Sequence, residues 1–103
     1  QGPFFFGAVD GFRDAAMSHR NTEDRIIILR MRMVPAIDAT GLNVLADFLR
    51  QCRREKIGLI LSGVLPDSQP MRAMEHYGLA AEIGKENICP HIDKALARAR
   101  ALV

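Results

Sequence analysis

Two short runs of apolar residues stand out from the polar sequence around them and predict buried β-strands. Ile26 to Leu29 is continuously apolar, which fits a strand covered on both faces, and Leu59-Ile60-Leu61 is the second such run. The first run continues as Arg30-Met31-Arg32-Met33. Alternation there predicts that Leu29, Met31 and Met33 point one way and both arginines the other.

The clearest helix is predicted from Thr40 to about Lys56, between the two strands. Its apolar residues recur at helical spacing and define a buried face, whereas residues such as Asn43, Asp47, Arg50 and Arg54 face outward. The predicted buried face comprises Leu42, Leu45, Phe48, Leu49 and Cys52.

Shorter elements complete the pattern. A helix is predicted from about Gln69 to Tyr77, ending at Gly78 as a left-handed cap, and a last helix from about His91 to Leu102. The buried stripe predicted for the last helix is Ile92, Ala95, Leu96 and Ala99. Further predictions are an extended segment at Phe4-Phe5-Phe6, a helix from Val9 to His19, and an irregular or strand-like stretch around Ile83 and Ile88.

Alternation of strands and helices predicts an α/β fold with a mostly parallel sheet and helices packed on it. At 103 residues the chain is one domain with a single modest core. The apolar fraction of 49% and the charged fraction of 25% are those of an ordinary globular protein. No apolar run approaches the roughly 20 residues needed to cross a bilayer, and the start of the chain lacks the features of a signal peptide.

Charge gives little reason to expect a nucleic-acid partner. The net charge is only +2, and the densest basic group, Arg50, Arg53, Arg54 and Lys56, is interpreted as a solvated helix face. Cys52 and Cys89 stand in unrelated settings. Cys52 is interpreted as a reduced core residue of a cytoplasmic protein, and a disulfide stays open on count alone.

The sequence offers few candidates for catalysis or metal binding. His19, His76 and His91 share no ligand spacing with one another or with a cysteine, so no metal site is predicted. Asp38 and Thr40 could begin a nucleophilic site, but no histidine or lysine nearby in the sequence would activate the hydroxyl. No glycine fingerprint for a nucleotide is present, and no cofactor is implied.

The candidate site is the segment Asp38-Ala39-Thr40-Gly41-Leu42, where the first buried strand leads into the long helix. Such strand-to-helix turns are where open α/β sheets hold their ligands. Asp38 or Thr40 is expected to cap the helix, and Gly41 lets the backbone approach a partner closely. The free N–H groups at the helix start near Gly41 could also attract an anion.

Three segments resemble one known family. Asp38-Ala39-Thr40-Gly41-Leu42 resembles the Asp-Ser-Ser/Thr-Gly-Leu signature of STAS domains, which occur in sulfate transporters and anti-sigma factor antagonists. Gly2-Pro3-Phe4-Phe5-Phe6-Gly7-Ala8 and Glu86-Asn87-Ile88-Cys89-Pro90 are similar to segments of the bacterial transporter branch. The resemblance covers essentially the whole chain.

The resemblance implies a mixed sheet of about four strands, with four to five helices packed mainly on one face. It implies that residues 1–103 are the C-terminal cytoplasmic domain of a SulP-type anion transporter, on the inner (plasma) membrane, with the family's first strand missing before Gln1. The implied partners are the membrane domain of the same polypeptide, a cytosolic protein or weakly bound nucleotide or anion, and a second copy at the unpaired sheet edge.

Three functions stay open at this point. The first is a non-enzymatic regulatory domain in which Asp38 to Leu42, with Val64 to Gln69 beside it at the same end of the sheet, is the docking or sensing surface. The second is a free-standing anti-sigma factor antagonist, because Thr40 occupies the position that is phosphorylated in that branch. Phosphorylation would place a dianion at a helix N-terminus. The third is a small enzyme with an unrecognised site.

Overall fold

Three short parallel strands form the centre of the computed structural model, which describes residues 26–102. The strands are β1 (Ile26–Arg30), β2 (Gly58–Ser62) and β3 (Ile88–Cys89), hydrogen-bonded in the order β1-β2-β3. The register pairs Arg30 with Ser62 and Ser62 with Cys89. All three strands therefore end at the same edge of the sheet, and the residues after them lie close together.

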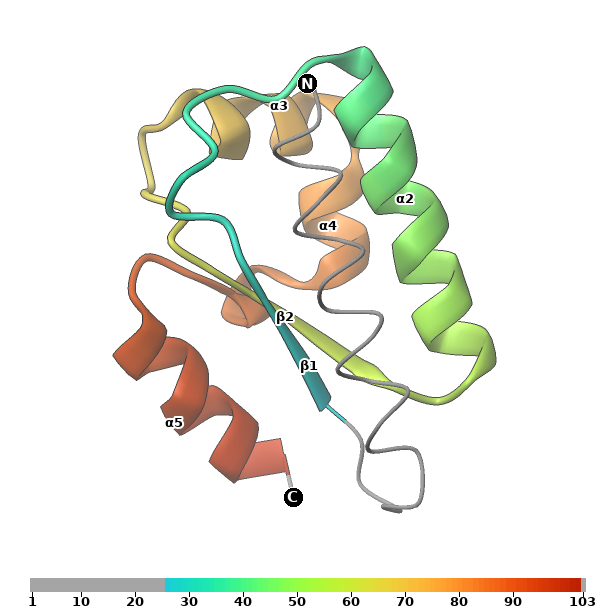
Figure 1. Ribbon diagram of the computed structural model, residues 1–103, viewed down its shortest axis with the longest axis vertical. Coiled ribbons are helices and arrows are strands. Elements are labelled where there is room, and N and C mark those ends of the chain that lie inside the picture. Colours follow the sequence, from blue (N-terminus) through green and yellow to red (C-terminus); the bar gives the residue numbers. More distant parts are fainter. Residues whose placement is uncertain (1–25, 103) are drawn as a thin grey trace.

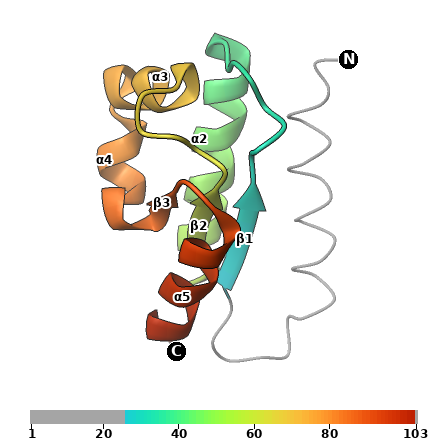
Figure 2. The ribbon, with the colours of Figure 1, turned by 90° about the vertical axis from the view of Figure 1, so that its left-hand side faces the viewer.

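Helices cover both faces of this sheet (Figure 1). They are α2 (Ala39–Arg54), α3 (Gln69–Tyr77), α4 (Leu79–Ile83) and α5 (Ile92–Leu102), with a short 3-10 turn, η1, at Lys85–Asn87. Helices α2, α3 and α4 pack on one face of β1 and β2, and α5 packs on the other. Figure 1 shows α5 and α2 on opposite sides of the two strands, and Figure 2 shows α3 and α4 on the side of the molecule away from β1. The prediction of an α/β fold with helices mainly on one face is confirmed, with three strands in the described part of the chain rather than about four.

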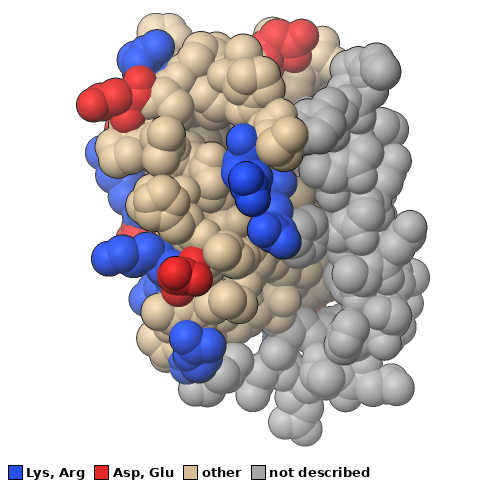
Figure 3. Space-filling view, turned by 60° about the vertical axis from the view of Figure 1, so that its left-hand side comes forward, with Lys and Arg blue, Asp and Glu red and all other residues tan. Residues whose placement is uncertain are grey.

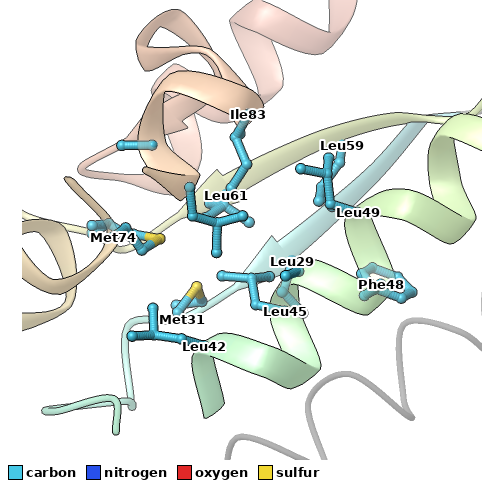
Figure 4. Packing of buried hydrophobic residues seen from close by; sticks show 14 of the residues in the cluster. Leu29, Met31, Leu42, Leu45, Phe48, Leu49, Leu59, Leu61, Met74 and Ile83 are labelled. Atoms are coloured by element: carbon cyan, nitrogen blue, oxygen red, sulfur yellow. The ribbon is translucent and has the colours of Figure 1, made fainter. Parts of the chain in front are cut away.

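The alternation of side chains along the strands divides the core in two. Leu29 and Leu61 belong to the larger cluster, beneath α2, α3 and α4, together with residues such as Leu45 and Met74 (Figure 4). Ile60 faces the opposite way and packs with Cys89 and with Ala95 of α5. Both faces of the sheet are thus buried, which is why the two strands are almost entirely apolar.

Helix α2 has the predicted buried face. Its buried residues are Gly41, Leu42, Leu45, Ala46, Phe48, Leu49 and Cys52, which include all five that the spacing predicts. The helix begins one residue before Thr40 and ends at Arg54, two residues before the predicted end at Lys56. It cannot continue through Lys56, because that residue adopts a left-handed φ of 59°.

Helix α3 has the predicted bounds, Gln69–Tyr77, and Gly78 follows it with a left-handed φ of 88°. Ser68 caps its N-terminus by accepting a hydrogen bond from the backbone N–H of Met71 at 3.3 Å. The stretch around Ile83 is helical, as the end of α4, so only its Ile88 part forms a strand. A helix of five residues is too short for its periodicity to be recognised in the sequence.

Two predicted side-chain directions are wrong. The strand ends at Arg30 and a turn follows at residues 32–33, so Met31 is buried (1% exposed) whereas Met33 is 64% exposed. Leu96 of α5 is 41% exposed, because α5 packs on the sheet through the narrower stripe of Ile92, Ala95 and Ala99. The predicted strand at Phe4 to Phe6 and the predicted helix from Val9 to His19 lie outside the described residues.

Candidate functional site

The loops that follow β1 and β2 lie side by side at the carboxyl edge of the sheet. They comprise residues 31–38 and 63–68, and the ladder between the strands continues into them where the N–H of Met31 donates to the carbonyl of Ser62 at 2.7 Å. One residue further, the two backbone segments approach so closely that a Cβ on Gly63 would lie 2.4 Å from the backbone nitrogen of Arg32. The first loop then leads into α2 and the second into α3 (Figure 1).

A side-chain amide joins the far ends of the two loops. Gln69, the first residue of α3, accepts a hydrogen bond from the N–H of Ile37 at 2.8 Å and donates one to the carbonyl of Ile37 at 3.0 Å. Both backbone polar groups of Ile37 are thereby satisfied by a residue 32 positions away. This contact confirms that the segment ending at Gln69 lies beside the loop that leads to Asp38.

Asp38 is the residue that caps α2. Its backbone is extended, and its Oδ1 accepts a hydrogen bond from the N–H of Gly41 at 2.9 Å, while its carbonyl accepts from the N–H of Leu42 at 2.9 Å. Ala39 and Thr40 are exposed in the first turn of the helix, whereas Gly41 and Leu42 are buried. The five predicted residues therefore divide into a structural set (Asp38, Gly41, Leu42) and an accessible pair.

Gly41 is required by a contact within the chain. A Cβ at this position would lie 2.8 Å from Cγ1 of Ile37, which is buried in the larger core cluster. The absence of a side chain at Gly41 thus allows α2 to start directly over Ile37. The close backbone approach expected at this glycine is made to Ile37, and it leaves Thr40 free to face solvent.

Exposed apolar residues are a feature of these loops that sequence reasoning missed. Met33 is 64% exposed and Leu65 is 52% exposed, and Pro35, Ala36 and Pro66 are exposed beside them in the sequence. Large apolar side chains held in water near one another are typical of surfaces that bind a partner. The signal in the sequence was a proline following soon after an apolar residue at each loop, which breaks the strand and prevents the residue from joining the core.

The arrangement gives no indication of catalysis. Among residues 26–102 there is no group of three or more His, Cys, Asp or Glu side chains that could hold a metal ion. His76 lies in the last turn of α3 and His91 just before α5, and no hydrogen bond joins either of them to Thr40 in the described part of the chain. The accessible groups at this edge of the sheet are the Thr40 hydroxyl and the exposed apolar residues of the two loops.

Both cysteines are buried, and they form no disulfide within the described part of the chain. Burial raises the pKa of the Cys89 thiol, and the nearby positive charges of Arg98 and Lys94 only partly oppose that shift. A raised pKa keeps the thiol protonated and unreactive near neutral pH. The interpretation of Cys52 as a core residue is confirmed.

The basic residues at the end of α2 form a solvated face, as predicted. Arg50 pairs with Asp47 one turn earlier at 2.7 Å, and both side chains are exposed. Arg53 donates to the backbone carbonyl of Glu82 in α4, which joins the two helices.

Within the described part of the chain, no helix has the length and apolar character needed to span a membrane.

Comparison with known proteins defines the class. The family model described as the STAS domain matches residues 1–95. The described fold agrees with that family: a parallel sheet is covered by helices, and the signature segment caps the helix after the first described strand. The chain belongs to the STAS domain family.

The relatives that the chain matches carry the names of sulfate or SulP transporters. A crystal structure of a sulfate transporter family protein from Wolinella succinogenes is 40% identical, with a TM-score of 0.73, covering 99% of this chain and 81% of that one. The SulP transporter STAS domain from Vibrio cholerae is 28% identical, with a TM-score of 0.75, covering 96% and 75%. The Bacillus subtilis (strain 168) protein named as sulfate transporter YvdB is 29% identical over 94 residues, which are 91% of this chain and 17% of YvdB.

These relatives bear on the competing interpretations. Two of the three relatives are named as sulfate transporter proteins and one as the STAS domain of a SulP transporter, and YvdB is far longer than the segment matched. None of the three names is that of an enzyme or of a free-standing antagonist. The antagonist alternative is therefore not favoured.

Proposed function

We propose that residues 1–103 form a regulatory domain of a SulP-type anion transporter and lie on the cytoplasmic face of the inner (plasma) membrane. The observation that carries the proposal is the pair of joined loops at the carboxyl edge of the sheet, found in a chain whose relatives are transporter STAS domains. The domain makes and breaks no covalent bonds, and it acts by contact.

The docking surface in this proposal is the accessible part of the joined loops, namely Met33, Pro35, Ala36, Thr40 and Leu65. Its partner is the membrane domain of the same polypeptide. The two hydrogen bonds between Gln69 and Ile37 hold the loops together before binding, so little conformational entropy is lost when a partner docks. A cytosolic protein, a bound nucleotide or anion, or a second copy of the domain would regulate transport by competing for this surface.

Deleting the domain tests the function. Sulfate uptake is measured in cells that carry the full reading frame containing these 103 residues, either intact or cut before Gln1. We expect uptake by the intact protein and a several-fold reduction for the truncated one at equal amounts in the membrane, quantified by immunoblot. A reading frame without membrane-spanning segments, or equal uptake by both proteins, would contradict the proposal.

Thr40→Glu tests the docking surface without disturbing the fold. Thr40 is exposed in the first turn of α2, where a negative charge interacts favourably with the helix dipole, so the free energy of unfolding should change by no more than about 0.5 kcal/mol. We expect sulfate uptake by the full protein to fall, because the new charge lies among the exposed apolar groups that dock.

Arg54→Gln is the matched control, since it also changes the charge by one negative unit but lies at the other end of α2 and is exposed. Fourteen helical residues separate the two positions by about 21 Å. Uptake should be normal in this variant. If Thr40→Glu and Arg54→Gln transport equally well, the loop is not the docking surface.

A further inference from the structure

A recess lies at the carboxyl edge of the sheet, on the face covered by α5. This α5 pocket has a volume of about 240 Å³ and is open to solvent. It is lined by Arg30, Arg32, Ser62, Gly63, Pro90, His91 and Ile92. The lining comes from the ends of β1 and β2 and from the segment that leads from β3 into α5, so the sheet register builds the pocket. None of these residues belongs to the proposed docking surface.

Positive charge dominates the lining. Arg30 and Arg32 are both exposed, and no acidic side chain lines the pocket. Within residues 26–102 neither arginine forms an ion pair, whereas Arg50 and Arg98 on other elements do. Figure 3 shows the side of the molecule that carries α5, where Lys and Arg atoms form a compact group near the centre of the face. Asp93 lies in the first turn of α5 but is not part of the lining.

Ser62 places a buried hydroxyl at the bottom of the pocket. It is the one buried polar residue of the described chain, at 2% exposure, and it pairs with Arg30 across the sheet. By strand alternation its side chain lies on the same face as that of Ile60, toward α5. No other described residue forms a hydrogen bond with this hydroxyl, and it is not sealed off from the pocket. The hydroxyl is therefore available to donate a hydrogen bond to a molecule held in the pocket.

The start of α5 adds backbone donors to the same pocket. His91 and Ile92 are in the lining, and the first backbone bond of the helix runs from the N–H of Ala95 to the carbonyl of His91 at 3.2 Å. The N–H groups of residues 92–94 therefore precede the hydrogen-bonded part of the helix. Such groups, together with the helix dipole, bind anions.

We propose that the α5 pocket binds a tetrahedral oxyanion carrying two negative charges. The planar guanidinium groups of Arg30 and Arg32 hold two of its oxygens, and the Ser62 hydroxyl and the N–H groups at the start of α5 donate to the others. Sulfate, inorganic phosphate and the phosphoryl group of a larger molecule share this chemistry. The volume of the pocket admits any of them together with water.

The close contact at Gly63 positions the pocket. Because the backbone of Arg32 lies directly against Gly63, the turn after β1 is held over the end of β2, and both arginines are kept on the rim. The binding chemistry does not depend on whether the chain regulates a transporter, since it follows from the lining alone.

The test is a titration of the 103-residue chain followed by ¹⁵N NMR at pH 7. Sodium sulfate, sodium phosphate and glycerol phosphate are added in turn, and sodium chloride at the same ionic strength is the reference. We expect saturable shifts of the amide signals of Ser62, Gly63 and residues 92–94 with at least one oxyanion, and none with chloride. Saturation by glycerol phosphate alone would assign the pocket to phosphoryl ligands, and saturation by sulfate would assign it to the free ion.

Variants separate binding from folding. Arg30→Gln and Arg32→Gln should each weaken the oxyanion about tenfold or more, because each removes a charged donor. Arg54→Gln, which removes an exposed arginine distant in the sequence, should leave the dissociation constant unchanged. Ser62→Ala should also weaken binding, yet its melting temperature should not fall, since no described residue loses a hydrogen bond.

Two results would overturn the oxyanion site. In the first, the amide shifts increase linearly with salt concentration and are equal for chloride and for all three oxyanions, which would reflect ionic screening only. In the second, binding is saturable, but the dissociation constants of Arg30→Gln and Arg32→Gln lie within twofold of that of the unsubstituted chain.

Discussion

Gly63→Ala is expected to be strongly destabilising, although it adds only one methyl group. Gly63 has a φ of 79°, and a Cβ there would lie 2.4 Å from the nitrogen, 2.6 Å from Cα and 2.7 Å from Cβ of Arg32. A non-glycine residue in the left-handed region costs about 1–2 kcal/mol. Forcing apart two packed backbones adds about 1–3 kcal/mol. We expect the free energy of unfolding, measured with urea, to fall by about 3–4 kcal/mol.

Gly78→Ala is the matched control. Gly78 has a φ of 88°, close to that of Gly63, but a Cβ there would have no atom within 4 Å. This variant has the backbone strain without the steric clash, so its free energy of unfolding should fall by about 1–2 kcal/mol. The difference in free energy of unfolding between the two variants measures how tightly the turn after β1 is packed against the end of β2. If both lose the same free energy of unfolding, the contact between Gly63 and Arg32 does not position the edge of the sheet.

The fold could be predicted where residues obey one strong periodicity. Helix α2 was recognisable because its buried residues recur over 16 residues, and α3 because Ser68, Gln69 and Gly78 stand at cap positions. Helix α4 was missed because five residues between Gly78 and Gly84 contain too few positions to define a period. The direction of Met33 was mispredicted because the turn at residues 32–33 interrupts the alternation that begins in β1.

The location of the candidate site could be predicted from the sequence, but the contacts that build it could not. The strand-to-helix turn at Asp38 follows from a local pattern, and so does the cap. The bonds between Gln69 and Ile37 join residues 32 positions apart, and no local rule predicts which amide will satisfy a given peptide. The α5 pocket was likewise invisible, because Arg30, Ser62 and His91 meet only through the register of three strands.

The largest effect of all is expected for Leu45→Asp, which should leave the domain unfolded. Leu45 is fully buried (0% exposed) and lies near Leu29, Leu42 and Met31 at the centre of the larger cluster (Figure 4). Loss of a buried leucine side chain costs about 2–5 kcal/mol. A carboxylate without a partner in this apolar cluster adds several kcal/mol more, and the sum approaches the whole stability of about 5–15 kcal/mol of a typical domain.

Two further variants on α2 make this result interpretable. Asn43→Asp introduces a carboxylate two residues earlier, where Asn43 is exposed and accepts a hydrogen bond from the hydroxyl of Tyr77 that a carboxylate can also accept. It should melt cooperatively within about 0.5 kcal/mol of the unsubstituted chain. Leu45→Ala should remain folded but lose about 2–5 kcal/mol. A soluble Leu45→Asp variant that melts cooperatively near the temperature of Asn43→Asp would show that Leu45 does not face the core. The packing of α2 on β1 and β2 would then have to be rejected, because that packing requires an apolar side chain at this position.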